Sequence, residues 1–212
     1  MSTRGKIPLW LKLAYSAFAA VLVPCYWATY SPWNFLFFCD AALLITLVAL
    51  WTENPLLASV PAVGITLAQI LWVIDFCAGG HFLGIAAYMF DAKLPLYLRA
   101  LSSFHGWLPF LLVWLVWRLD YDRRALAAQV ALTWGLVLTA YFFGPQPPAP
   151  VDRPNLAVNI NYVHGPSFER PQTWMHPAAW VATLMVALPM ILYLPTHFVL
   201  CRLFPPRPAD AD

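Results

Sequence analysis

Residues 54–74 read NPLLASVPAVGITLAQILWVI and contain no Asp, Glu, Lys or Arg. A helix that crosses a bilayer needs about 20 mostly apolar residues, and this stretch supplies them. Further charge-free stretches occur at 13–39, 100–117, 125–151 and 171–201. The pattern therefore predicts an integral membrane protein whose chain crosses the bilayer several times.

The overall composition supports the same interpretation. The 212 residues are 61% hydrophobic and 16% aromatic, and only 10% are charged. A soluble domain is usually about 25% charged, so this chain has too little charge for a normally hydrated surface or for disorder. The net charge of +2 is too small to indicate a nucleic-acid partner. Membrane lipids are the expected partners.

We expect one all-α transmembrane domain over residues 1–212 with about six spans. The second span is interrupted by Asp40, and the fourth reaches the needed length only if it begins at Leu96. That start brings Arg99 and His105 into the span, where such residues are tolerated only toward a bundle interior or a watery cavity. The expected spans are 9–30, 33–51, 56–78, 96–118, 125–144 and 177–201.

The basic residues predict how the chain is oriented. With both termini in the cytoplasm, the inner segments hold eight of them, namely Arg4, Lys6, Lys12, Arg118, Arg123, Arg124, Arg202 and Arg207. The outer segments then hold four, namely Lys93, Arg99, Arg153 and Arg170. The positive-inside rule favours this arrangement. It places the Pro-rich segment 145–176 outside, where we expect an ordered cap, since proline removes donors and fixes backbone angles.

Two carboxylates at membrane depth need an explanation. Asp40 lies inside the second span and Asp75 near the outer end of the third. A carboxylate in hydrocarbon costs several kcal/mol unless it is paired, hydrated or protonated. One interpretation is a functional acid or proton site, and the other is a structural pair with Arg99.

Cys39 and His105 are expected at the same depth. His105 lies 13 residues from Arg118, about 20 Å above the inner end of its span. Cys39 lies 12 residues from Trp51, about 18 Å above the inner end of its own. A thiol and an imidazole at the same depth can form a nucleophile–base pair if their helices face each other. The alternative is a histidine that only hydrogen-bonds neighbouring helices.

No cofactor or metal is expected. The chain contains no HExxH, CxxC or CxxCH sequence, which are the spacings that make zinc, redox or haem sites recognisable. His81, His164 and His176 on the outer side, with Asp91 and Glu169, offer metal ligands without that spacing. A disulfide among Cys25, Cys39 and Cys77 is left open.

Three segments carry a resemblance to known membrane proteins. They are Asn34-Phe-Leu-Phe-Phe-Cys39-Asp40, Phe104-His105-Gly106 and Asn159-Ile-Asn161-Tyr162-Val. In these segments and in their order the chain resembles six-helix membrane proteins of the bacterial YwaF-like type, androgen-induced-gene lipid hydrolases and transmembrane acyltransferases. The resemblance implies acyl-ester chemistry in a bacterial inner membrane, with Cys39 as nucleophile and His105 as its base. The hydrolases of that group use a threonine where this chain has Cys39.

The other polar residues fit the same hypothesis in supporting roles. Asp40 or Asp75 would orient the imidazole, and Asn34, Asn161 or a backbone amide near Gly106 would stabilise an oxyanion. The wider set expected to contact substrate is Asn34, Arg99, Asn159, Asn161 and His164. A small transporter or channel, and a non-catalytic subunit of a membrane complex, are the alternative functions. The protein partners left open are a second copy of the chain or such a complex.

Overall fold

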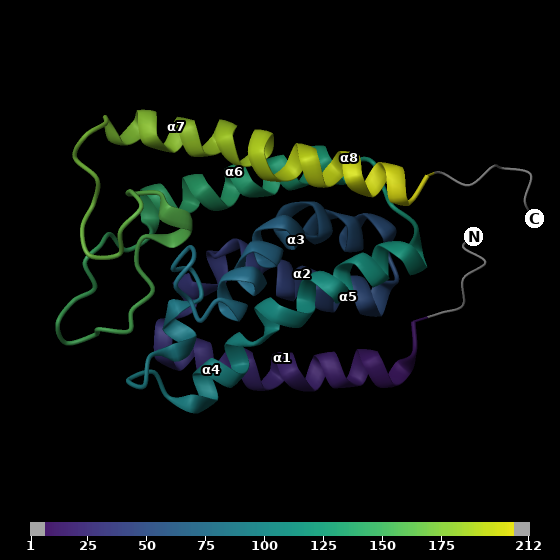
Figure 1. Ribbon diagram of the computed structural model, residues 1–212, viewed down its shortest axis with the longest axis horizontal. Helices are drawn as coiled ribbons and strands as arrows, with labels where there is room; N and C mark the ends of the chain where they lie inside the picture. The colour runs from purple at the N-terminus through teal and green to yellow at the C-terminus, as the bar shows by residue number, and fades with distance from the viewer. Residues whose placement is uncertain (1–6, 206–212) are drawn as a thin grey trace, which may run out of the picture.

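The computed structural model describes residues 7–205, which are all-helical and contain no β-strand (Figure 1). Arg4, Lys6 and Arg207, which contributed to the predicted orientation, lie outside the described residues. In chain order the α-helices are α1 (Leu9–Tyr30), α2 (Phe38–Thr52), α3 (Pro55–Cys77), α4 (Leu96–Ser102), α5 (Phe104–Leu119), α6 (Ala125–Phe143), α7 (Pro177–Leu188) and α8 (Leu194–Leu203). Three short 3₁₀ turns, η1 (Pro32–Leu36), η2 (Ala87–Phe90) and η3 (Ile160–Tyr162), and a π-helical turn, η4 (Pro189–Tyr193), complete the fold.

Five helical segments of the described chain are long and apolar enough to cross a membrane. They are Leu9–Tyr30, Pro55–Cys77, Leu96–Leu119, Ala125–Phe143 and Pro177–Leu203. The sixth expected span, 33–51, is a helix only from Phe38, and its 15 residues extend about 22 Å. That is shorter than a hydrocarbon core of about 30 Å. The fold is a multi-pass helical bundle, and the six-span count stays a prediction.

A local break explains why α2 begins late. Pro32 starts the η1 turn, and Phe37 then takes an extended backbone conformation before α2 begins. The Asn161 side chain holds this break from a distant loop. Its Oδ1 accepts the Phe38 N–H at 3.0 Å, and its Nδ2 donates to the Leu36 carbonyl at 2.8 Å. Both backbone groups that the break leaves outside a helix are thereby satisfied.

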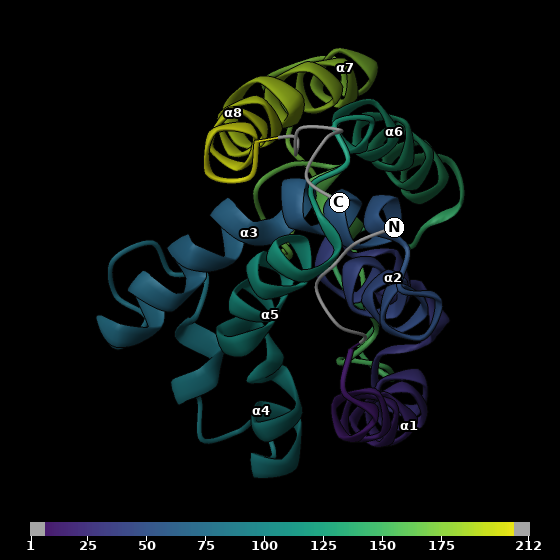
Figure 2. The same ribbon diagram turned by 90° about the vertical axis from the view of Figure 1, so that its right-hand side faces the viewer.

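Helix α3 is the central helix of the bundle (Figure 2). It packs against α2, α5 and α6, and 61% of its most apolar window is buried, compared with 17–44% for the other spans. Gly64 permits close contact with α6, since a Cβ at this position would lie 2.5 Å from the Gln129 carboxamide. The remaining helices therefore present most of their apolar surface outward, as expected for helices surrounded by lipid.

Two of the long segments are irregular where they pass the interior. Leu96–Leu119 divides into α4 and α5 at Ser103, and Figure 2 shows the two parts at an angle. The last segment widens into the π-helical turn η4 between α7 and α8. Such π-helical turns occur frequently at functional sites. Both irregular points border the cavity described below.

The long connections lie at one end of the bundle and the short ones at the other. The start of α1 and the end of α8 lie at the same end as the α2–α3 and α5–α6 turns, opposite the loops 78–95 and 144–176 (Figure 1). The Pro-rich loop has its own small core, in which Ala157, Ile160 and Val163 pack with residues of α6 and α7. Buried Asn159 stabilises the loop by donating to the Gly165 and Ser167 carbonyls and accepting from the His164 N–H.

Candidate functional site

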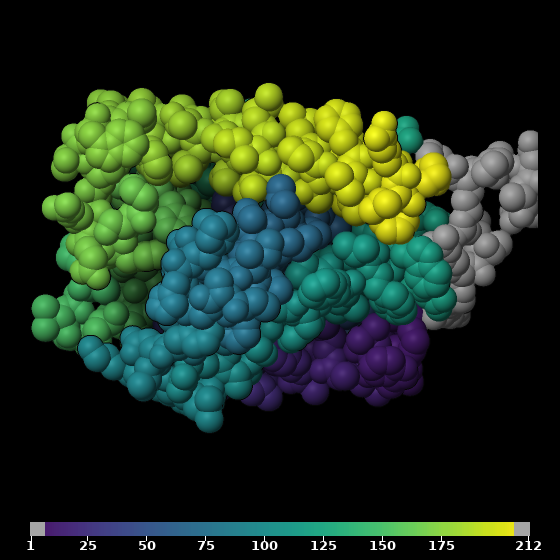
Figure 3. All heavy atoms as spheres, in the orientation of Figure 1, coloured from purple at the N-terminus to yellow at the C-terminus, as the bar shows by residue number. Residues whose placement is uncertain are grey.

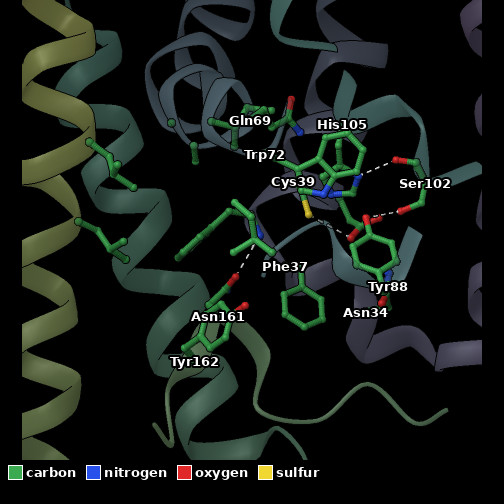
Figure 4. Close-up of a pocket in the computed structure, with 18 of the residues that line it drawn as sticks. Asn34, Phe37, Cys39, Gln69, Trp72, Tyr88, Ser102, His105, Asn161 and Tyr162 are labelled. Carbon is green, nitrogen blue, oxygen red and sulfur yellow. Dashed lines mark hydrogen bonds between the residues drawn. The ribbon is translucent and has the colours of Figure 1, made fainter. Parts of the chain in front are cut away.

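A cavity of about 490 Å³ lies between α3 and α7, toward the end of the bundle that carries the long loops. Helices α1, α2, α5 and the loops also contribute to it, and Figure 3 shows a recess on the face where α7 borders α3 and the loop that follows. Its walls are mainly apolar. The polar and aromatic-hydroxyl side chains that line it are Tyr26, Tyr30, Asn34, Cys39, Asp40, Gln69, Trp72, Tyr88, Ser102, His105, Asn161, Tyr162 and Tyr193 (Figure 4).

Cys39 and Asp40 lie in the first turn of α2, directly after the break that Asn161 holds. The Cys39 Sγ lies 3.5 Å from Asp40 Oδ2 and donates to it. The second carboxylate oxygen, Asp40 Oδ1, is buried and has no hydrogen-bond partner in the described protein. The thiol expected to be a nucleophile therefore lies beside a proton acceptor on the cavity wall.

His105 enters the same cavity from the first turn of α5. Its Nδ1 lies 2.8 Å from the Ser102 carbonyl oxygen, which can only accept, so Nδ1 carries the hydrogen. In the neutral ring Nε2 then has the lone pair that a general base needs. The ring is held flat against Trp72, with centroids 5.3 Å apart and planes at 27°. Cys39 and His105, predicted at one depth, line one cavity.

Several buried polar atoms in the cavity walls have no partner within the described protein. They are Asn34 Nδ2, Asp40 Oδ1, Trp72 Nε1 and both Nε2 and Oε1 of Gln69. Buried polar groups in proteins are nearly always hydrogen-bonded, and leaving one unpaired costs about 1–3 kcal/mol. Their concentration in one cavity indicates a site built for a ligand with polar groups.

Asn161 lines the cavity, but both polar atoms of its side chain bind backbone groups, which is a different role from that of the predicted oxyanion donor. Its side-chain oxygen and nitrogen both bind backbone groups of residues 36 and 38, as described above. Asn34 is the amide whose Nδ2 has no partner within the described protein. Of the two predicted oxyanion donors, Asn34 is the one whose side chain does not bind backbone groups, and it lies beside the Asp40 carboxyl on the cavity wall.

Asp75 is fully buried at the end of α3 but does not line the cavity. Its Oδ1 accepts from the N–H groups of Phe82, Leu83 and Gly84, and its Oδ2 accepts from that of Ala86. This carboxylate organises the loop after α3, with donors from the backbone and not from a basic side chain. Neither the pair with Arg99, which was one of the two interpretations, nor an orienting bond to His105 occurs among the hydrogen bonds of residues 7–205.

Three further predicted substrate residues also lie outside the cavity lining. Arg99 donates to the Met89 carbonyl at 3.4 Å, and Asn159 is occupied within its own loop. His164 packs against Tyr141, with ring centroids 5.7 Å apart, and burial lowers the pKa of its imidazole. Within the described chain, these residues support the loops that cover the cavity.

Metal ligands do not gather in the part of the chain that the structure describes: no three His, Cys, Asp or Glu side chains there are placed to share an ion. Cys25, Cys39, Cys77 and Cys201 are all free thiols. Another histidine lies close to a cysteine near the other end of the bundle. His197 Nδ1 lies 2.6 Å from the Tyr121 hydroxyl, and its Nε2 lies 3.6 Å from Cys201 Sγ.

Sequence reasoning did not select Gln69, Trp72, Tyr88 or Ser102, which all line the cavity. Gln69 stands in a charge-free stretch, and an amide in a membrane helix was the available signal. Tyr88 hydrogen-bonds Ser102 at 2.8 Å, and burial raises the pKa of its phenol, so it stays a neutral hydroxyl. Trp72 resembles any other tryptophan of a membrane span, and nothing in the sequence distinguishes it.

The chain matches no family model, no curated protein and no solved structure.

Proposed function

We propose that the protein is a membrane enzyme that cleaves or transfers the acyl group of a lipid ester. The observation that carries this proposal is the convergence of Cys39, Asp40 and His105, from α2 and α5, on one largely apolar cavity. The Cys39 thiol donates to Asp40 Oδ2, and a thiol beside a proton acceptor is the arrangement that activates a cysteine nucleophile. The resemblance in the segments around Cys39 and His105 implies the same chemistry.

The proposed reaction proceeds in two steps. Cys39 Sγ attacks the ester carbonyl carbon, its proton passes to His105 Nε2 or Asp40, and a bond forms between sulfur and the acyl carbon. The C–O bond then breaks, and the departing alkoxide takes up the proton. In the second step, water or a lipid hydroxyl attacks the thioester carbonyl carbon and loses its proton to the same acceptor. The C–S bond then breaks, the acid or new ester leaves, and the thiolate takes the proton back from the acceptor. If water is the acyl acceptor, the protein is a hydrolase, and if a lipid hydroxyl is the acceptor, it is an acyltransferase.

Charge that develops on the carbonyl oxygen needs a nearby donor. Asn34 Nδ2 is buried in the cavity wall and has no protein partner, which suits this role. An oxyanion donor is worth about 10²–10³ in rate in well-studied enzymes. Asn34→Asp exchanges the amide donor for an acceptor and is therefore expected to slow the reaction.

We further propose that both termini face the cytoplasm of a bacterium and that the cavity opens toward the outer leaflet of its inner membrane. The excess of basic residues in the predicted inner segments supports this orientation. Exposed Cys77 lies at the loop end of α3, and Cys201 is near the opposite end of the bundle. A membrane-impermeant maleimide added to intact cells is expected to label Cys77 and spare Cys201. Labelling of Cys201 instead would reverse the orientation.

Turnover by the purified protein tests the enzyme proposal. Fatty-acid release from a panel of acyl esters is measured by mass spectrometry for wild type, Cys39→Ala, His105→Ala and Cys25→Ala. Cys25 is half-buried on α1 and does not line the cavity, so it is the matched cysteine control. We expect Cys39→Ala to fall to background and His105→Ala to lose about 10²–10⁴ in rate. Normal turnover by both variants would refute the proposal, and substrate flux through proteoliposomes would instead favour a transporter.

A further inference from the structure

The charge of the cavity walls limits what can bind there. Among the described residues, no Lys or Arg side chain lines the cavity. Asp40 is the carboxylate on the wall, and His105 is the ring that can gain a positive charge. A buried phosphate or carboxylate needs cationic partners, since moving an unpaired anion out of water is very costly. The walls therefore disfavour an anionic headgroup.

The unpartnered wall atoms instead suit uncharged oxygen groups. Asn34 Nδ2, Gln69 Nε2 and Trp72 Nε1 are donors, while Gln69 Oε1 and Asp40 Oδ1 are acceptors. The exposed fractions of the four side chains are 3% for Gln69, 4% for Asp40, 6% for Trp72 and 7% for Asn34. An ester carbonyl needs donors only, whereas a hydroxyl needs both a donor and an acceptor. These donors and acceptors therefore match a ligand that carries both an ester carbonyl and a hydroxyl.

The size of the cavity sets how much of a lipid it holds. A volume of 490 Å³ corresponds to about 16 groups of the size of a water molecule or methylene. That accommodates a small headgroup, one ester and part of one acyl chain. Leu184, Leu188 and Leu192 form an apolar wall on the α7–η4 side, along which the rest of the chain can leave toward the bilayer.

From these features we propose that the ligand of this cavity is an uncharged acyl ester with a free hydroxyl, of the monoacylglycerol or diacylglycerol class. This proposal names the substrate of the enzyme proposed above and rests on it for the chemical step only. Gln69 and Trp72 hold the hydroxyl-bearing headgroup, and Asp40 accepts from its hydroxyl. Asn34 faces the ester carbonyl.

The test compares two ligands that differ by one phosphate. Non-hydrolysable ether analogues of a monoacylglycerol and of the matching lysophosphatidic acid compete with a radiolabelled monoacylglycerol ether on the Cys39→Ala protein in detergent. We expect the uncharged analogue to bind at least about ten-fold more tightly, because the cavity walls offer no Lys or Arg to a buried phosphate. A zwitterionic lysophosphatidylcholine analogue is the third arm and is expected to bind as weakly as the acid.

Substitutions of Gln69 test whether the cavity wall causes the preference for the uncharged analogue. On the same protein, Gln69→Leu is expected to weaken binding of the uncharged analogue about ten-fold, and Gln69→Lys to move the preference toward the phosphate. Trp72→Phe removes the indole N–H and keeps an aromatic ring. It tests the same wall donors if the Gln69 variants fail to fold. Buried Gln129, which donates to Thr133 and does not line the cavity, gives the matched control Gln129→Leu.

The outcomes separate this inference from the enzyme proposal. Equal or tighter binding of either phosphate-bearing analogue would overturn the inference, as would unchanged binding in both Gln69→Leu and Trp72→Phe. If the uncharged analogue is preferred but wild type turns over no ester, the substrate class stands as a ligand class and the enzyme proposal fails. If esters of phospholipids are turned over as well as uncharged ones, the enzyme proposal stands and the inference fails.

Discussion

Asn161 is expected to control both the stability of the bundle and the position of Cys39. Its side chain makes two bonds, to the Phe38 N–H and to the Leu36 carbonyl, at the break before α2. Removing the side chain leaves the Phe38 N–H and the partly buried Leu36 carbonyl without partners. Loss of a helix cap costs about 0.5–2 kcal/mol, and an unpaired buried carbonyl costs about 1–3 kcal/mol. We expect Asn161→Ala to destabilise the protein by about 2–4 kcal/mol.

The backbone of Asn161 has a positive φ of 53°, which asparagine tolerates better than alanine. Asn161→Gly therefore separates backbone strain from the loss of the side-chain hydrogen bonds, because glycine tolerates the positive φ and loses only those bonds. For a chain of this length, about 3 kcal/mol lowers the melting temperature by about 6–12 °C. Exposed Asn155 in the same loop provides the control Asn155→Gly, which is expected to shift the midpoint by only a few degrees.

Thermal unfolding in detergent measures the stability, and maleimide labelling measures the local effect. In a background where Cys25, Cys77 and Cys201 are replaced, fraying of the first turn of α2 is expected to speed the labelling of Cys39. A melting temperature within about 2 °C of wild type for both Asn161 variants, with unchanged labelling, would refute the proposed clamp.

Three other substitutions follow from the contacts. Asp75→Ala removes the acceptor of four loop N–H groups, so hydrogen exchange of residues 82–86 should rise; unchanged protection would show that the loop holds itself. Because burial lowers the pKa of His164 in the folded protein, the unfolded chain takes up the proton first below about pH 6.5. The stability of the folded protein should therefore fall on acidification, and it should fall less in His164→Gln. Equal pH dependence of the melting temperature in wild type and His164→Gln would contradict this. Gly64→Ala meets Gln129 at 2.5 Å and should cost about 1–3 kcal/mol, whereas Gly135→Ala on open surface should not destabilise, as melting curves will show.

The transmembrane pattern was predictable because it depends on local composition. Five of the expected spans match the five long helical segments within two residues at each end, and the start of the fourth span at Leu96 agrees with α4. Depth counted along each helix predicted that Cys39 and His105 lie at one level, and both residues line the same cavity. Neither step required knowledge of which helices are neighbours.

The parts that sequence reasoning missed depend on contacts between distant residues. The late start of α2 depends on Asn161, which is 123 residues away from Phe38. The role of Asp75 depends on four backbone N–H groups of the loop that follows α3, and no sequence pattern predicts a carboxylate with four backbone donors. Gln69 was missed for a different reason: a neutral amide in a membrane helix usually bonds another helix, whereas this one faces a cavity.

The contacts of Asn161 also connect the outer loop to the proposed chemistry. Asn161 belongs to the loop between α6 and α7, and the backbone that it holds leads directly into Cys39. Tyr162 and Phe168 of the same loop line the cavity and are 40% and 44% exposed, so a ligand that enters past them contacts the loop first. A displacement of the loop that breaks either Asn161 bond would release the first turn of α2 and move the thiol relative to His105. Cavity entry and nucleophile position are therefore expected to be coupled, and ligand binding should protect Cys39 from maleimide in wild type more strongly than in Asn161→Gly.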